Sequence, residues 1–447
     1  MGDGRMYHPS ASMRTRTLVS LLTLLILTVP CAAQERLTLE RAIELALANN
    51  ERAGIADAQL AVADARVNRA RSFFFPELSV GGTYTRRAYE STREIGGETV
   101  TIQSANALNG TVTVSSPLFD ARAFPLYRQA KFARDAARFD TANDKRLLAF
   151  EAADAFIATL SLEQVLQATE RRRDLAKANY DDAAARFEAG LVSSNDVTRA
   201  ELELATAERE ATRQGGNVQI AYLMLGNLLD TEVAGPLVPP TDLLERAASP
   251  EATLEYTVEA ARDARQDLMA ARSSAAALRE FAEEPTRRFI PTLSLLGQYR
   301  ATNEGGLSGR DSDGLASISL LWPVFDGGER GAERAERLAL ARAAELDASL
   351  LDRRVELDLR QALVAIASEQ ASIRSALTAV TVARRNAVET QELYRQGLAS
   401  ALEVTDANVR LFEAEVEAAR ANYQLALAYL DLRAASGRTP QGQENPS

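Results

Sequence analysis

One short segment of this chain occurs twice. FEAGLVSSNDVTRA (residues 187–200) is matched by YRQGLASALEVTDA (residues 394–407). Aligned on Gly190 and Gly397, both copies have an aromatic residue three positions before the glycine and a leucine directly after it. Both also have a serine at +3, a carboxylate at +6, a Val-Thr pair at +7 and +8, and an alanine at +10. Agreement of this extent between distant segments indicates an internal duplication.

Each copy lies between two long, alanine-rich segments that predict helices. Apolar and small residues recur there at alternating spacings of four and three, which is typical of a coiled-coil seam. A glycine at the junction of two helices favours a reversal of the chain. The sequence therefore predicts two long helical hairpins, with tips at Gly190 and Gly397.

The composition limits the chemistry of the chain. Of 447 residues, 46% are hydrophobic and only 6% aromatic, which favours long interlocking helices over a compact enzyme. The net charge of -11 argues against a nucleic-acid partner, because phosphate binding needs a basic surface. With one His and one Cys, we expect no metal, no cofactor and no thiol chemistry. Paired carboxylates occur only at helix ends, so an enzyme is not expected.

The N-terminus resembles a secretory targeting signal. The apolar segment Leu18–Val29 follows two arginines and precedes small residues suited to cleavage. We therefore predict a signal peptide over residues 1–33, with Met13 as an alternative start. Cys31 follows a proline, which is a poor residue for a lipid-attachment signal, so lipidation is not expected. No later segment is apolar for the 18 residues that a membrane-crossing helix needs.

The rest of the chain is predicted to contain two repeats, a linker and a tail. The first repeat spans residues 34–234, with a β-hairpin over 77–116 and a helical tip near 190. The linker spans 235–249. The second repeat spans 250–437, with a β-hairpin over 291–325 and a helical tip near 397, and residues 438–447 form a polar tail.

Several residues are expected to begin or end helices. Thr38 is a candidate N-cap of the first helix, and Asp120 and Asp326 are candidate caps of the two long helices. The pair Gly215-Gly216 is expected to interrupt a return helix. Pro285 is expected to end a helix that begins near residue 250.

The two predicted β-hairpins alternate apolar residues with small polar ones, in strands of about ten residues, as in transmembrane barrel walls. A polar, glycine-containing loop near residues 94–98 joins the first pair. A small sheet packed on helices is the alternative, but export and the absence of other membrane elements favour a barrel. Four strands cannot close a barrel, and lipid does not tolerate open edges, so several copies must contribute strands.

The order LTLERAIELAL, FFPELS, SPLFD, long helix and GLVSSNDV, followed by a second set, closely resembles the TolC-like outer-membrane efflux protein family. The resemblance implies a mainly α protein with a β-barrel part. It implies a homotrimer with a 12-stranded outer-membrane barrel, four strands per protomer, continued by a long periplasmic α-helical coiled-coil barrel. Such a protein is the passive exit duct of a tripartite efflux or type I secretion system. Its partners are outer-membrane lipid, a periplasmic adaptor, and an inner-membrane pump or ABC transporter.

Two acidic residues follow the second tip. Glu403 and Asp406 are three positions apart and share one helical face. If that face points inward, a trimer carries a ring of carboxylates that attracts cations and gates the periplasmic entrance. Mutual repulsion within the ring would raise the pKa values of these carboxylates. The resemblance supports this assignment. The alternative is that they are solvated acids favoured by the helix dipole in a first turn.

Tyr394 precedes the second tip, and Asp196 is the first-repeat counterpart of Glu403. A hydrogen bond from the Tyr394 hydroxyl to Asp196 between neighbouring hairpins is one candidate closing contact. Packing of Tyr394 on the turn is the alternative.

The tip segments themselves resemble the part of the family that docks adaptor hairpins, and capping contacts at a helix end are the alternative. Some family members carry a basic residue that helps to lock the closed state where this chain has alanine, so a basic latch is absent at this position. The candidate docking residues are Gly190, Leu191, Val192, Gly397, Leu398 and Ala399.

A different class of protein also fits part of the sequence. An exported coiled-coil structural or adhesin-like stalk explains the long helices and the signal peptide, but not two alternating β-hairpins at matched positions. Because drug efflux, metal efflux and protein secretion share this kind of duct, we expect substrate choice to reside in the inner-membrane partner.

Overall fold

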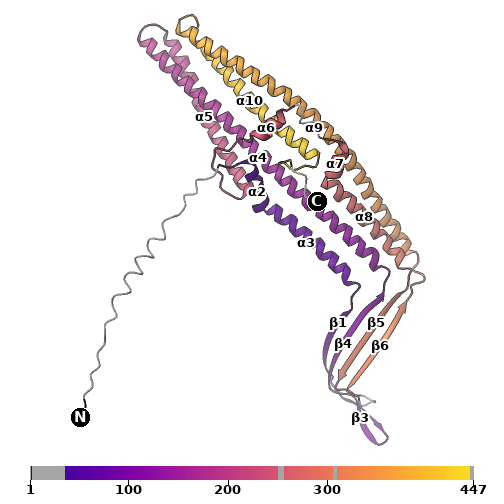
Figure 1. Ribbon diagram of the computed structural model, residues 1–447. Helices are drawn as coiled ribbons and strands as arrows, with labels where there is room; N and C mark the ends of the chain where they lie inside the picture. The colour runs from indigo at the N-terminus through magenta and orange to yellow at the C-terminus, as the bar shows by residue number, and fades with distance from the viewer. Residues whose placement is uncertain (1, 3–35, 250–255, 306–309, 443–447) are drawn as a thin grey trace.

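The computed structural model describes residue 2 and residues 36–249, 256–305 and 310–442. The predicted signal peptide, with Met13 and Cys31, lies outside these residues apart from residue 2. The described chain is elongated, with a β-sheet at one end, the two helical tips at the other, and long helices between them (Figure 1). Within the described residues, no helix has the length and apolarity needed to cross a membrane.

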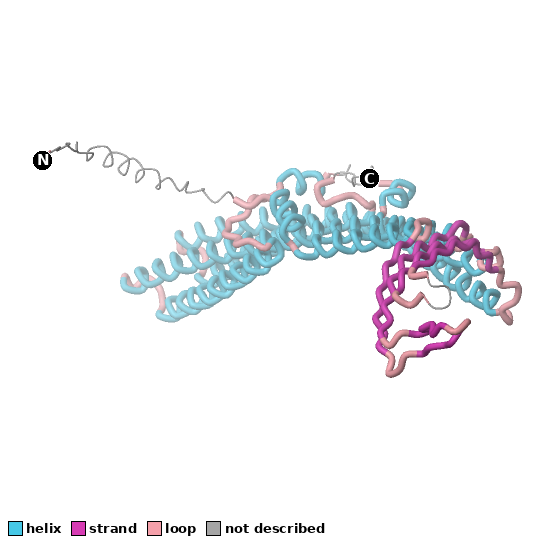
Figure 2. The backbone as a smooth tube through the Cα atoms, turned by 90° about the horizontal axis from the view of Figure 1, so that it is seen from below, coloured by secondary structure: helices cyan, strands magenta, loops and turns pink. Residues whose placement is uncertain are grey.

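The helices follow the same order in both repeats. In the first repeat they are α2 (Leu39–Asn49), α3 (Glu51–Ser72), α4 (Ala123–Glu188) and α5 (Ser194–Leu229). The short α6 (Thr241–Ala248) and α7 (Val258–Ala264) precede the second set, which comprises α8 (Gln266–Arg287), α9 (Glu329–Arg395) and α10 (Ala401–Ala435). With 66 and 67 residues, α4 and α9 are each about 100 Å long. Figure 2 shows the short helices and the C-terminal segment on one side of the long-helix layer.

Four strands form one antiparallel sheet in the order β1-β4-β5-β6: β1 (Glu77–Arg86), β4 (Asn106–Phe119), β5 (Thr292–Thr302) and β6 (Ser312–Leu321). The register places Val80 opposite Val112, and Val112 opposite Tyr299, so apolar residues share one face across the strands. Small polar residues share the other face, as Ser79 lies opposite Thr113 and Thr113 opposite Gln298. The predicted alternation is confirmed.

The segment between β1 and β4 differs from the prediction of a loop. It contains a second sheet of two strands, β2 (Ser91–Ile95) and β3 (Glu98–Gln103). Gly96 and Gly97 connect them with φ of 63° and 93°, and two positive φ values are what a tight hairpin turn of this length needs. This ribbon lies beyond the end of the main sheet that is farthest from the helices (Figure 1).

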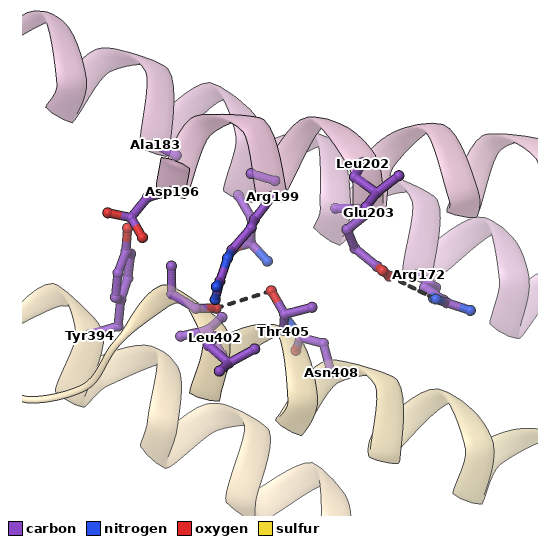
Figure 3. A pocket seen from close by; sticks show the side chains of 15 residues that line it. Arg172, Ala183, Asp196, Arg199, Leu202, Glu203, Tyr394, Leu402, Thr405 and Asn408 are labelled. Atoms are coloured by element: carbon purple, nitrogen blue, oxygen red, sulfur yellow. Dashed lines mark hydrogen bonds and ion pairs between the residues drawn. The ribbon is translucent and has the colours of Figure 1, made fainter. Parts of the chain in front are cut away.

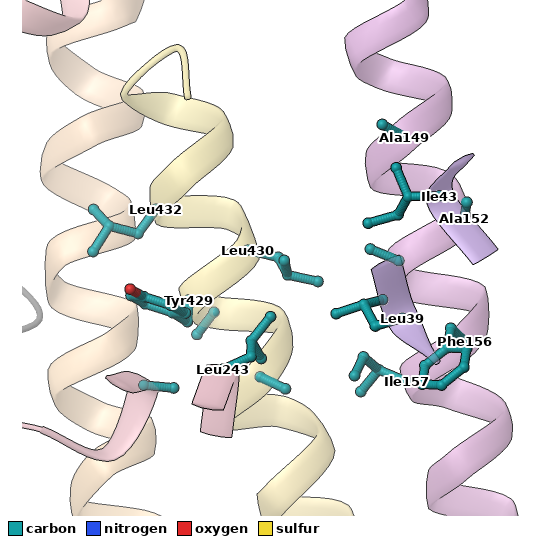
Figure 4. Close-up of a cluster of buried hydrophobic side chains, with 14 of the residues drawn as sticks. Leu39, Ile43, Ala149, Ala152, Phe156, Ile157, Leu243, Tyr429, Leu430 and Leu432 are labelled. Carbon is teal, nitrogen blue, oxygen red and sulfur yellow. The ribbon is translucent and has the colours of Figure 1, made fainter. Parts of the chain in front are cut away.

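Small side chains dominate the helical core and let the helices approach closely. In Figure 4, Leu39 and Ile43 of α2 face Phe156 and Ile157 of α4, while Tyr429 of α10 lies in a second group. All five are at most 5% exposed, and both groups belong to one apolar cluster. Along the two predicted coiled-coil seams, the buried residues are Leu148, Ala152, Thr159, Leu359, Ile366, Gln370 and Ile373.

Thr38 caps α2 as predicted, because its hydroxyl accepts from the Arg41 amide at 3.2 Å. Asp120 and Asp326 are not the N-cap residues, since the N-caps are Arg122 and Gly328. Each aspartate lies two residues earlier. Asp120 accepts from the N-cap amide at 2.9 Å, and Asp326 from the N-cap amide of its own helix at 3.1 Å.

Two predicted helix breaks were wrong. α5 runs through Gly215-Gly216 without interruption, because packing of α5 along α4 outweighs the weak helix propensity of glycine. Pro285 lies inside the last turn of α8, and the helix continues to Arg287. The break in that region lies instead at Arg265, an extended residue whose guanidinium group pairs with Asp267 at 2.7 Å. The predicted start of this helix near residue 250 lies outside the described residues.

Candidate functional site

The two tips have the same backbone geometry. Gly190 and Gly397 adopt φ of 75° and 73°. The amide after Gly190 donates to the carbonyl of Arg186 at 2.8 Å, and the amide after Gly397 donates to that of Leu393 at 2.8 Å. These six-residue hydrogen-bonded turns are Schellman motifs, in which the left-handed position favours glycine. The predicted reversal at both glycines is confirmed.

Substituting alanine for Gly190 and Gly397 should loosen both tips. Alanine in the left-handed region costs about 1–2 kcal/mol, so we expect amide hydrogen exchange at the tips to accelerate roughly tenfold or more. Gly331 offers a matched control, since it lies within α9 without a positive φ and no heavy atom lies within 4 Å of an added Cβ. Gly331→Ala should leave tip exchange unchanged. Equal exchange in the tip variants and the wild type would contradict the expectation that alanine is strained at these two positions.

Each return helix begins with a reciprocal cap. The backbone amide and hydroxyl of Ser193 donate to Asp196 at 3.1 and 2.8 Å, and those of Ser400 donate to Glu403 at 2.6 and 2.9 Å. This is the capping box, in which the third helical residue satisfies the free amide of the N-cap residue. It explains the repeated serine at +3 and carboxylate at +6. This capping role was not predicted, although a serine followed three residues later by an acid is its signature.

The two candidate gate acids have separate partners within one chain. Glu403 turns back to Ser400, and the backbone hydrogen bond from Ser400 holds the pKa of Glu403 below its usual value. Asp406 forms an ion pair with Arg410 at 2.9 Å, with both side chains more than half exposed. The predicted rise of pKa through mutual repulsion is therefore not a property of the single chain, where the pKa of Glu403 is lowered.

Tyr394 lies at the contact between the two hairpins. The guanidinium carbon of Arg186 lies 4.6 Å from the Tyr394 ring centroid, and its Nη1 donates to the Tyr394 carbonyl at 3.5 Å. Figure 3 shows the Tyr394 hydroxyl directed toward Asp196. Burial raises the pKa of Tyr394, and it outweighs the opposing charge of Arg186, while the charges of Asp182 and Asp196 add to the rise. Tyr394 and Asp196 thus line the same cavity, and the hydrogen bond expected between them stays a prediction. Arg186 was missed because only the fold places it beside the second repeat.

A cavity of about 380 Å³ separates the hairpins just behind these contacts (Figure 3). Its far end is closed by Arg172, which pairs with Glu203 at 2.8 Å and lies 4.8 Å from the Phe412 ring centroid. Glu415 of α10 then binds Arg171 of α4 at 2.8 Å and Arg384 of α9 at 2.9 Å. Ion pairs therefore join the helices farther from the tips, whereas beside the tips the contact between the hairpins is that of Arg186 with Tyr394.

The leucines of the tips project into solvent. Leu191 and Leu398 are 74% and 73% exposed. In a Schellman motif the residue after the glycine often packs back on its own helix, and here neither leucine is covered in this way. Val192 and Ala399 beside them are half-buried.

No group of three or more His, Cys, Asp and Glu residues in the described part of the chain could hold a metal ion.

Comparison with known proteins defines the class. The model of the family described as "Outer membrane efflux protein" matches residues 42–230 and 257–438. The chain belongs to this family of outer-membrane channels, which are not enzymes. Its strands are therefore assigned to the outer membrane and its long helices to the periplasm, as predicted.

Individual relatives agree with this placement. Outer membrane protein TolC of Escherichia coli is 23% identical over 395 residues, covering 83% of this chain and 76% of TolC. Protein CyaE of Bordetella pertussis is 27% identical over 358 residues, covering 77% of this chain and 73% of CyaE. The CmeC outer membrane channel of Campylobacter jejuni has the same fold, with a TM-score of 0.75 at 16% identity, covering 92% of this chain and 87% of CmeC. The predicted family is confirmed, and the chain is an outer-membrane exit channel.

Proposed function

We propose that the chain is the duct of a tripartite efflux or type I secretion system and acts as a homotrimer. The sheet supports this assembly: its apolar face is exposed, with Val80 at 77% and Ile318 at 67%. Its edge strands β1 and β6 each pair with one neighbour, and their outer sides have no strand partner within the described chain. Three copies supply twelve strands, which close a barrel and remove every edge from lipid. A water-soluble stalk would leave this apolar face in water.

The helical tips form the periplasmic entrance in this proposal, and an adaptor linked to an inner-membrane pump or ABC transporter docks on them. Conduction is passive. Closure depends on contacts such as Arg186 with Tyr394, and the ring of Glu403 and Asp406 makes the entrance cation-attracting. The support is geometric: the acids lie in the first two turns of α10 after the tip, and Arg186 contacts Tyr394 between the hairpins there.

The assembly is tested on protein extracted from the outer membrane in detergent. We expect a trimer that dissociates on heating, and loss of the gene should cause accumulation of an efflux dye or retention of a secreted protein. A monomeric, water-soluble rod, or a null strain with unchanged export, would contradict the proposal.

Arg186→Gln is expected to open the entrance partially. The substitution removes the cation over Tyr394 and the ion pair of Arg186 with Asp182, while retaining an uncharged polar side chain. Cation–π contacts of this kind contribute about 0.5–2 kcal/mol, so the open population should rise by roughly 2-fold to 30-fold in single-channel recordings. Arg385→Gln, on an exposed pair two turns away, is the control. Unchanged conductance in Arg186→Gln would remove this contact from the closing mechanism.

A further inference from the structure

The junction between α3 and β1 carries a patch of cations and aromatic rings. We define the junction patch as Arg71, Phe74, Phe75, Phe124, Tyr127 and Lys131. The Arg71 guanidinium carbon lies 5.7 Å from the Phe75 ring centroid, and the Lys131 ammonium lies 6.0 Å from that of Tyr127. Phe74 joins the two halves through edge contacts with Phe124 at 5.4 Å and Tyr127 at 6.0 Å.

The patch is open to its surroundings. Phe75 is 53% exposed and Phe124 51%, and both cations are exposed. Phe124, Tyr127 and Lys131 follow one another at spacings of three and four, which places them on one stripe of α4. Exposed aromatic residues beside the apolar band of a sheet are typical of a membrane–water interface, because outer-membrane barrels carry girdles of aromatic residues there.

The charge of the patch is not neutralised by the chain. Neighbouring arginines at the same level have carboxylate partners: Arg122 binds Asp120 at 2.7 Å and Arg128 binds Glu280 at 2.9 Å. Within the described ranges, neither Arg71 nor Lys131 lies within ion-pair distance of a carboxylate. The first acidic residue after Arg71 in the sequence is Glu77, at the start of β1. Strand alternation places Glu77 on the same face of the sheet as Ser79, which is the polar face.

We propose that the junction patch binds the phosphate of an anionic phospholipid in the periplasmic leaflet of the outer membrane. The exposed apolar face of β1 starts at Leu78 and Val80, directly beyond the patch. A lipid whose acyl chains lie on this face would therefore have its headgroup at Arg71 and Lys131. A guanidinium group binds phosphate through two parallel hydrogen bonds, and a basic cluster beside a membrane selects anionic headgroups. The inference rests on the membrane location and not on conduction.

Native mass spectrometry of the detergent-extracted trimer with added phosphatidylglycerol or phosphatidylcholine tests the proposal. Phosphatidylglycerol should be retained preferentially, and the double variant Arg71→Gln, Lys131→Gln should bind it roughly tenfold more weakly. Arg71→Lys should retain the preference, because the charge is kept. The control is Arg209→Gln with Arg374→Gln, which removes the same charge from exposed positions on α5 and α9.

Equal retention of the two lipids by the wild type would overturn the proposal, as would undiminished phosphatidylglycerol binding by the double variant. Occupation of the patch by a second copy of the chain is a third outcome. In that case Arg71→Cys would resist a water-soluble maleimide in the intact trimer and react only after heat dissociation, which would also overturn it. A heat-dissociable trimer in every variant shows that the fold is retained.

Discussion

Replacing Leu191 and Leu398 with aspartate is expected to abolish export while leaving the trimer and its conductance intact. Both side chains are about three-quarters exposed in the chain alone, so the substitutions cost the isolated protein little. If an adaptor buries them, each aspartate places an unpaired charge in an apolar contact. Such burial costs several kcal/mol, and export should fall by roughly 100-fold or more in a dye-accumulation or secretion assay.

The methionine variants of the same two leucines separate docking from folding. Methionine conserves volume and apolar character and costs less than about 1.5 kcal/mol. Leu191→Met with Leu398→Met should therefore export nearly as well as the wild type. Wild-type export by the aspartate variants would show that these leucines are not the docking surface, and that their exposure reflects only the geometry of the turn.

Glu403→Gln with Asp406→Asn is expected to remove most of the block by multivalent cations. In a trimer the two substitutions remove six carboxylates from one narrow entrance. We expect the blocking concentration of a trivalent cation to rise roughly tenfold or more in planar bilayers. Glutamine suits the test better than alanine, because it can still accept from Ser400 and preserve the capping box.

The pH dependence of the block follows from the lowered pKa of Glu403. The hydrogen bond from Ser400 favours its charged form, so this acid takes up a proton at a lower pH than an ordinary glutamate does. Block by multivalent cations should therefore weaken at a lower pH than it would with an ordinary glutamate at this position. Glu389→Gln, an exposed acid of α9 two turns before the tip, is the control. Unchanged block in the double variant would leave Glu403 as a helix cap and Asp406 as a solvated partner of Arg410.

The features that could be predicted are those encoded by local periodicity. Strand alternation predicted which residues share each face of the sheet. A register shift of one residue would move every apolar side chain of a strand to the opposite face, so the register is strongly specified. The repeated glycines located both turns because few other residues tolerate that conformation. Arg186 could not be found in this way, since its partner Tyr394 lies in the other repeat. The pair Gly215-Gly216 led to the wrong prediction of a break in α5, because the low helix propensity of glycine is a weaker effect than packing along a long helix.

We propose above all that this chain forms a conducting duct closed at its helical tips. Single-channel recording of the purified trimer in a planar bilayer tests it most directly. We predict small, cation-selective currents that multivalent cations block from the side of the helical tips and that increase in Arg186→Gln. A trimer that inserts without conductance in both the wild type and Arg186→Gln, or a protein that does not insert, would contradict it.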